Sequence, residues 1–213
     1  RPQIVARYRP GALAYEISSG VANDGSIRLD LLPLRGARGL IGRVELGSHS
    51  LGGAEFILAF GGVDGKRGRR GGDIGCETEP VSEFFKLRPE QCTGNQITTT
   101  GSVFIVRGKS ATMAGLMSPA FAEVADGKHW SSLFHLIPPR ANPLGPPLQS
   151  DTPVVLLRRP LEPHQPAYFV LAQTSSNITF AEFAREFGAG QLREIFAKAE
   201  ADRQAIAERV VVD

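Results

Sequence analysis

The sequence has few of the residues from which metal, redox and disulfide sites are built. It contains two cysteines, Cys76 and Cys92, and four histidines among 213 residues. Two cysteines cannot form a disulfide framework, and their spacing matches neither a zinc site nor a CxxC redox pair. The histidines lack HxH or HxxE spacing, so we expect no metal and no cofactor. A free buried Cys92 thiol and a bridge between Cys76 and Cys92 both stay open.

An excess of charge of one sign is missing, and so is any long apolar run. The 24 basic residues nearly balance the 22 acidic ones, for a formal net charge of +2. Nucleic-acid recognition usually needs a concentrated basic face, so we expect no nucleic-acid partner. No apolar stretch approaches the roughly 20 residues of a membrane-spanning helix, so we expect no membrane span. The remaining composition, with 42% hydrophobic residues, is typical of a folded globular protein.

Short apolar segments separated by turn residues occupy most of the chain. The 24 glycines and 15 prolines would interrupt helices, and between Ile27 and Leu32 apolar and polar side chains alternate with the period of a strand. Asn23-Asp24-Gly25 predicts a hairpin turn. We therefore predict a mainly β fold, an antiparallel β-sandwich of the supersandwich type, over residues 1–177. The predicted strands are residues 11–17, 27–34, 40–46, 54–60, 96–100, 102–106, 154–157 and 168–172.

Residues 178–213 have helical character. Thr179-Phe180-Ala181-Glu182 has the form of a helix capping box. We expect Gly188 and Gly190 to interrupt the helical stretch, and an amphipathic helix to follow and to end near Glu208. Its apolar face should pack against the sandwich or against a further domain. The apolar ending Val210-Val211-Val212-Asp213 favours a linker that leads towards such a domain.

The segment between Gly61 and Gly75 contains seven glycines and a dense run of cations. Glycine permits close backbone approach, so the segment suits a loop that wraps a ligand or packs on a neighbouring domain, and a solvated loop is the alternative. No phosphate-binding GxxxxGK[ST] pattern is present. We do not predict a catalytic role for its acids, because single acids in loops are mostly structural or surface groups. The candidate substrate-binding residues here are Lys66, Arg67, Arg70, Asp73 and Glu77.

Trp130 is the single tryptophan, and His129 precedes it directly. Sugar binding commonly combines an aromatic platform with polar side chains, because a pyranose has an apolar face and a ring of hydroxyls. Trp130 and His129 are therefore further candidate substrate-binding residues. A buried role for Trp130 in the hydrophobic core is the alternative.

Several segments together resemble a known family. They are the glycine-rich segment, Pro89-Glu90-Gln91-Cys92 with the residues around it, the opening Arg7-Tyr8-Arg9-Pro10, and the helical residues 199–207. The chain resembles the uncharacterised N-terminal domain of putative bacterial glycoside hydrolases, whose remaining chain is predicted to form an (α/α)6 barrel. The resemblance implies that the acid and base of glycoside hydrolysis lie in that barrel, so we predict no catalytic residue in this chain.

The function that follows is an accessory and interface domain that contributes loops to the substrate cleft of a glycoside hydrolase. The expected partners are an oligosaccharide or polysaccharide and the (α/α)6 barrel of the same protein, and a homo-oligomer remains open. Export to the periplasm or the medium is expected, and the start at Arg1 without methionine agrees with processing. A free-standing carbohydrate-binding, lectin-like module is the alternative.

Overall fold

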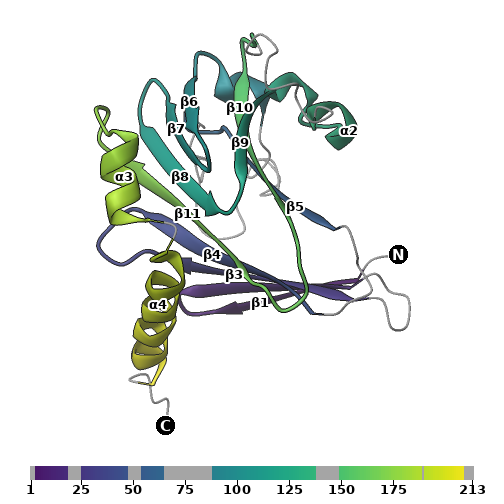
Figure 1. The fold of residues 1–213 in the computed structure, drawn as a ribbon, viewed down its shortest axis with the longest axis vertical. Helices are drawn as coiled ribbons and strands as arrows, with labels where there is room; N and C mark the ends of the chain where they lie inside the picture. Colours follow the sequence, from purple (N-terminus) through teal and green to yellow (C-terminus); the bar gives the residue numbers. More distant parts are fainter. Residues whose placement is uncertain are drawn as a thin grey trace, which may run out of the picture.

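The computed structural model describes residues 3–18, 25–47, 54–64, 88–137, 149–188 and 190–208, and within them it contains two antiparallel sheets (Figure 1). The large sheet has eight strands in the order β1-β2-β3-β4-β11-β8-β7-β6, and the small sheet has three in the order β5-β10-β9. The strands are β1 (Gln3–Arg9), β2 (Ala12–Ser18), β3 (Ser26–Pro33), β4 (Gly39–Leu46), β5 (Glu55–Phe60), β6 (Gln96–Thr100), β7 (Val103–Arg107), β8 (Thr112–Ser118), β9 (Phe121–Asp126), β10 (Pro153–Pro160) and β11 (Ala167–Thr174).

The two faces of the large sheet are covered by different elements. Helices α3 (Phe180–Glu186) and α4 (Leu192–Ala207) pack on one face, and the small sheet packs on the other (Figure 1). The short helices η2 (Pro89–Cys92), η3 (Gly127–His129) and α2 (Leu133–Leu136) lie against the outer face of the small sheet. The molecule is therefore a sandwich with helices outside it, which confirms the predicted mainly β, sandwich-type fold.

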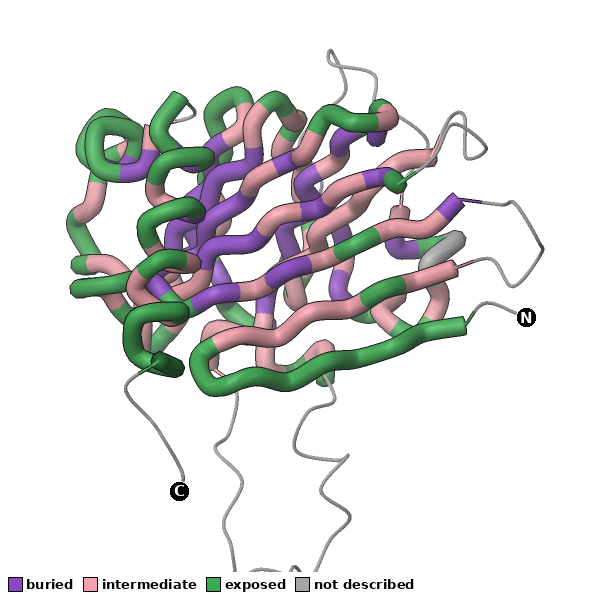
Figure 2. Tube along the Cα trace, turned by 90° about the horizontal axis from the view of Figure 1, so that it is seen from below, coloured by how far each residue is buried: buried purple, intermediate pink, exposed green. Residues whose placement is uncertain are grey.

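Strand alternation divides side chains between the two faces as the pattern predicts. Ile27, Leu29 and Leu31 contribute to the core between the sheets. Leu32 lies in the core under the helices, and Asp30 shares that face because it alternates with its apolar neighbours. Burial is greatest in the middle strands of the large sheet and falls towards β1, which is exposed along its whole length (Figure 2).

Two phenylalanines of the large sheet lie over glycines in neighbouring strands. Phe169 is paired with Gly42, and Phe104 with Gly115, and a Cβ at either glycine would overlap the ring. Each ring also meets a phenylalanine of β5 across the sandwich. The ring centroids of Phe56 and Phe169 are 5.8 Å apart, and those of Phe60 and Phe104 are 6.0 Å apart. Glycine thus leaves space for the end of each ring over the neighbouring strand while the ring contacts the opposite sheet.

Three strands were not predicted. β1 has both faces exposed and carries two arginines, so it lacks an apolar stripe. β8 contains a glycine and two methionines, and β9 contains four residues of low strand propensity, two alanines, a glutamate and an aspartate. These strands form because their neighbours in the sheet supply backbone partners and apolar contacts, which a local pattern does not record.

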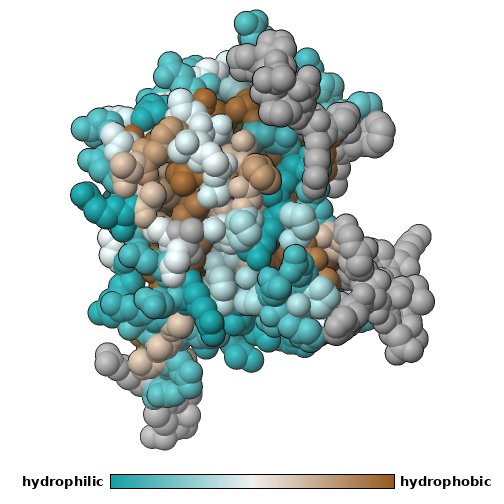
Figure 3. Space-filling view, viewed as in Figure 1, coloured by the Kyte–Doolittle hydropathy of each residue, from teal (hydrophilic) through white to brown (hydrophobic). Residues whose placement is uncertain are grey.

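The helices agree closely with the prediction. Thr179 caps α3 through its side chain, which accepts from the Glu182 backbone N–H at 3.2 Å, while the Glu182 carboxylate accepts from the Thr179 N–H at 2.9 Å. Helix α4 buries Leu192 and Phe196 against the sandwich, and Arg35 pairs with Asp202 of α4 at 2.9 Å. The exposed face of α4 is mainly hydrophilic (Figure 3).

The outer face of the small sheet has its own small core. Cys92 is a free, fully buried thiol there, and burial, followed by the nearby Glu90 charge, raises the pKa of Cys92 to about 11. Arg158 pairs with Glu55 at 2.8 Å and with Glu123 at 3.3 Å, joining the three strands of the sheet. Among the described residues, none of the helices combines the length and apolarity needed to cross a membrane.

The glycine–phenylalanine pairing generates a stability prediction. Gly42→Ala should lower the free energy of unfolding by about 1 to 3 kcal/mol, because the new methyl forces the Phe169 ring against Phe56. Phe169→Leu should cost less in the Gly42→Ala background than in the wild type, since leucine frees space over residue 42. Urea denaturation of the four proteins of this double-mutant cycle measures both effects. Strictly additive losses would contradict the packing described here.

Candidate functional site

The sequence-predicted site residues fall into two groups. Lys66, Arg67, Arg70, Asp73 and Glu77 lie outside the described residues, so their proposed contact with substrate stays a prediction. His129 and Trp130 are described, and both are partly buried at the outer face of the small sheet.

Trp130 follows η3 and packs at the border of the core formed around Cys92, Leu136 and Leu156. The His129 ring lies beside that of His135, with 5.7 Å between ring centroids. The His135 Nδ1 and the Ser132 hydroxyl are 2.8 Å apart. The structure thus brings an indole and two imidazoles together at one corner of the sandwich, and the indole packs partly against the core.

Asp126 holds the turn that carries these rings. Its carboxylate accepts hydrogen bonds from the Lys128 backbone N–H at 3.1 Å, the Ser150 hydroxyl at 2.8 Å and the Thr152 hydroxyl at 3.2 Å, and it pairs with the Lys128 ammonium at 2.7 Å. Burial by itself would raise the pKa of Asp126, but these donors outweigh it and lower the pKa to about 2. The turn between β9 and α2 is therefore tied to the residues that lead into β10.

A second site lies on the helix-covered face of the large sheet, where α4 leaves most of β1 and β2 uncovered. A cavity of about 360 Å³ opens there between β1, β2, β3 and the side of α4. We call it the charged groove. Its lining includes four arginines and four acidic residues, which are Arg7, Arg9, Arg28, Arg203, Glu16, Asp30, Glu45 and Glu200.

Strand register places the groove charges in rows across the sheet. Glu16 of β2 is opposite Arg28 of β3, which is opposite Glu45 of β4. In the next row Asp30 is opposite Arg43. Acidic and basic side chains alternate along each row, so like charges are never directly opposed in these pairs.

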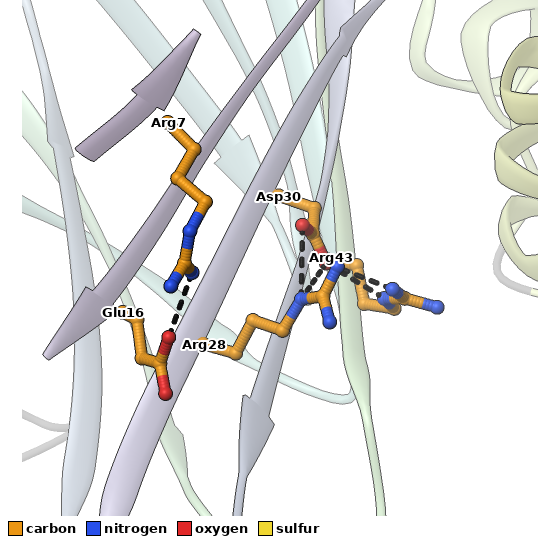
Figure 4. A network of polar contacts seen from close by, with 5 residues as sticks. All are labelled: Arg7, Glu16, Arg28, Asp30 and Arg43. Carbon is orange, nitrogen blue, oxygen red and sulfur yellow. Dashed lines mark hydrogen bonds and ion pairs between the residues drawn. The ribbon is translucent and has the colours of Figure 1, made fainter. Parts of the chain in front are cut away.

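Figure 4 shows how these side chains are joined. Arg7 donates to Glu16 at 2.8 Å across β1 and β2. The Asp30 carboxylate accepts from the Arg28 Nε at 2.9 Å and from the Arg43 guanidinium at 2.8 Å. The Asp30 side chain is only 11% exposed, whereas that of Arg28 is 58% exposed. Asp30 is thus the buried centre of the network, and Arg28 presents most of its guanidinium to the groove.

Arg43 joins this network to the hydrophobic core. Its guanidinium carbon lies 4.8 Å from the centroid of the Phe196 ring, a cation–π contact beneath α4. Burial disfavours its charged form, but the hydrogen bond and charge of Asp30 and the charge of Glu200 outweigh that cost, so the pKa of Arg43 is raised. The cation therefore stays charged at the border between core and groove.

The groove is suited to hydrogen bonding with a polar ligand. Guanidinium groups only donate and carboxylates only accept, so their alternation offers both kinds of partner within one small surface. Its volume lies at the small end of the range of ligand pockets. Among the described residues, no group of three or more His, Cys, Asp and Glu side chains is arranged to hold a metal ion. The site thus offers recognition by hydrogen bonds and charge.

The sequence does not predict this groove, although part of the signal is visible in it. Arg28 and Asp30 were recognised as alternating with apolar residues in one strand, which marks a polar sheet face. Arg43 and Glu45 repeat the same spacing in the next strand. What could not be read was that α4 covers only part of this face and leaves the rest of its charged side chains open.

Comparison with known proteins adds one match. A family model described as Domain of unknown function (DUF4450) matches residues 1–138, which include the strands that form the charged groove and the His129–Trp130 corner. No curated protein matches the chain.

The charged network predicts an ordered set of stability losses. Asp30→Ala should lower the free energy of unfolding by about 2 to 4 kcal/mol, because it leaves the half-buried Arg43 without its carboxylate partner. Arg7→Ala, which removes only an exposed pair with Glu16, should cost less than about 1 kcal/mol. Urea denaturation of both variants gives the comparison. Equal losses would mean that Asp30 is no more than a surface partner.

Asp126 predicts a specific acid sensitivity. Its folded-state pKa of about 2 lies below the ordinary 3.8, so its stabilisation is complete above about pH 4 and disappears as the pH falls towards 2. Asp126→Asn should therefore flatten the pH dependence of unfolding free energy in this range. Ser150→Ala should move the loss to higher pH, because it removes one donor that favours the carboxylate. Urea unfolding across the acid range checks both, and an unchanged Asp126→Asn profile would refute the assignment.

Proposed function

The chain belongs to the DUF4450 family. From its resemblance to the N-terminal domain of glycoside hydrolases and from its charged groove we propose that it is a carbohydrate-contacting accessory domain of such an enzyme. In this proposal the (α/α)6 barrel of the same protein carries the catalytic acid and base. The sandwich contributes a recognition surface and an interface to that barrel, and the protein acts in the periplasm or outside the cell.

The charged groove is the observation that carries the proposal. Each hydroxyl of a sugar is both a donor and an acceptor, so a ring of hydroxyls can bridge a guanidinium and a neighbouring carboxylate at once. Arg28 and Glu45 occupy neighbouring positions in one row and line the cavity together. This arrangement supports binding of the polar edge of a sugar, or of the end of a longer chain, within the groove.

The same contacts favour recognition over catalysis at this site. Glycoside hydrolysis requires two carboxyl groups at a set separation, one of which donates a proton while the other acts as base or nucleophile. Glu16 and Asp30 are instead engaged by arginines at 2.8 Å. Their role as acceptors within an ion-pair network fits a surface that positions a glycan for chemistry elsewhere.

A free-standing lectin-like module is the second candidate. The observation that favours it is that α4 buries its apolar residues Leu192 and Phe196 on this sandwich and needs no further domain to cover them. A lectin should bind glycans as the isolated chain. An accessory domain should add affinity mainly when the barrel is present.

Glycan binding tests the proposal. We expect the chain, or the longer protein that contains it, to bind members of a panel of neutral and uronate-containing oligosaccharides in isothermal titration calorimetry. Arg28→Ala should raise the dissociation constant at least tenfold, which corresponds to a loss of about 1.4 kcal/mol of binding free energy. The fold should survive, because Asp30 keeps its contacts with Arg43. The chain alone should show no glycosidase turnover.

Arg193→Ala is the matched control. Arg193 lies on the exposed side of α4 and does not line the cavity, so its loss should leave binding unchanged. Glycan binding that survives Arg28→Ala and Glu45→Gln together would remove the groove from the proposal. Turnover by the isolated chain would overturn the accessory role itself.

A further inference from the structure

Strand β1 is the outermost strand of the large sheet, and it is unusually exposed. All seven of its residues are exposed, and in Figure 2 it runs uncovered along one side of the sheet. Five large hydrophobic side chains are exposed among the described residues, and three of them, Ile4, Val5 and Tyr8, lie on this strand. Tyr8 is 81% and Ile4 is 61% exposed. An apolar patch on an open edge marks an interaction surface.

The edge of β1 carries Arg7 and Arg9, but it has neither a bulge nor a proline, two further features that usually prevent pairing. All seven residues pair with β2 in an unbroken register, so no bulge interrupts the strand, and no proline occurs between Gln3 and Arg9. Among the described strands β1 pairs only with β2, so its outward N–H and C=O groups have no strand partner there. Ile4 and Tyr8 extend from the face of the sheet that includes Leu13 and Ile17, while Val5 and Arg7 lie on the opposite face with Glu16.

The sequence of β1 is complementary to itself in one antiparallel register. When Ala6 of one chain lies opposite Ala6 of a second, Ile4 meets Tyr8, Val5 meets Arg7, and Gln3 meets Arg9. The exposed apolar pairs then fall together on one face, and no two like charges are opposed. This register uses the whole strand.

Neighbouring registers are less favourable. A shift that centres the pair on Arg7 places two arginines directly opposite each other, which is repulsive. A shift that centres it on Val5 leaves Tyr8 and Arg9 beyond the paired residues of β1. Shifts by one residue would place the two chains' apolar residues on opposite faces.

We propose that β1 pairs with β1 of a second copy of this chain, antiparallel and centred on Ala6, to form one continuous sheet across a twofold axis. The interface is an edge-to-edge contact, smaller than the roughly 1,600 Å² of a standard protein interface. It should therefore be a reversible dimer that dissociates on dilution. The charged grooves of the two copies would open on the same face of the joined sheet, one on each side of the axis.

Opposite substitutions at Val5 test the pairing. Val5→Arg places a cation opposite Arg7 of the second copy, so the dimer dissociation constant should rise about tenfold, while Val5→Glu should lower it by attracting the same arginine. Within one chain Val5 is opposite Glu16, so these changes affect the monomer in the opposite sense. Weaker dimerisation of Val5→Arg can then not be explained by a destabilised chain. Sedimentation equilibrium over a wide concentration range provides the measurement.

Cysteine crosslinking tests the register. Ala6→Cys lies opposite itself across the axis and should form a covalent dimer on mild oxidation, whereas Tyr8→Cys alone should not. A mixture of Tyr8→Cys and Ile4→Cys chains should crosslink as a heterodimer. The unmodified chain, with its own cysteines, is the control.

Three results would overturn the proposal. The first is a chain that stays monomeric at every concentration, and the second is a dimer whose dissociation constant neither Val5 substitution changes. The third is that Tyr8→Cys alone crosslinks more readily than Ala6→Cys. The second result would assign dimerisation to another surface. The glycan-binding experiment can be distinguished from all three, because it changes Arg28 of β3, although Arg7 and Arg9 of β1 also line the groove.

Discussion

The sandwich depends on two phenylalanines whose rings reach over glycines of neighbouring strands. Phe169 and Phe104 occupy the space that a side chain at Gly42 or Gly115 would otherwise fill. Both rings contact phenylalanines of β5 in the opposite sheet. Because the two glycines lie in β4 and β8, on either side of β11, the contacts are spread across the middle of the large sheet. They determine how closely the small sheet can approach, and they leave the other face of the large sheet to the helices.

That division of faces creates the candidate site. Helices α3 and α4 cover the middle of the large sheet with Phe183, Phe187, Leu192 and Phe196. The sheet is wider than the two helices, so the polar face of β1 to β3 remains open beside α4. Arg43 lies at the border, in contact with Phe196 on one side and Asp30 on the other. The same cation thus stabilises the helix packing and orders the charges that line the groove.

The sequence predicted secondary structure well where a local pattern, such as alternation or a helix cap, specifies it. Alternation from Ile27 to Leu32 predicted both the strand and its apolar side, and the capping box at Thr179 predicted the start of α3. It was uninformative for β1, whose exposed faces carry no stripe, and for β8, whose glycine is explained only by Phe104 of the neighbouring strand. Among the candidate residues, Trp130 was predicted as either a core residue or a sugar platform. The structure places its ring partly in core contacts, and its role as a platform stays a prediction.

By itself the sequence determined the mainly β class, the positions of most strands, and the change to helices near residue 178, because these follow from local periodicity, turn residues and caps. Tertiary structure decided the charged groove and the open β1 edge. Arg7 and Glu16 form one ion pair and Asp30 and Arg43 another, and these residues of four strands lie together on one face only because strand register places them in adjacent rows. Which strand ends a sheet, and where a helix stops covering it, are consequences of packing between distant segments, and no local pattern of side chains encodes them.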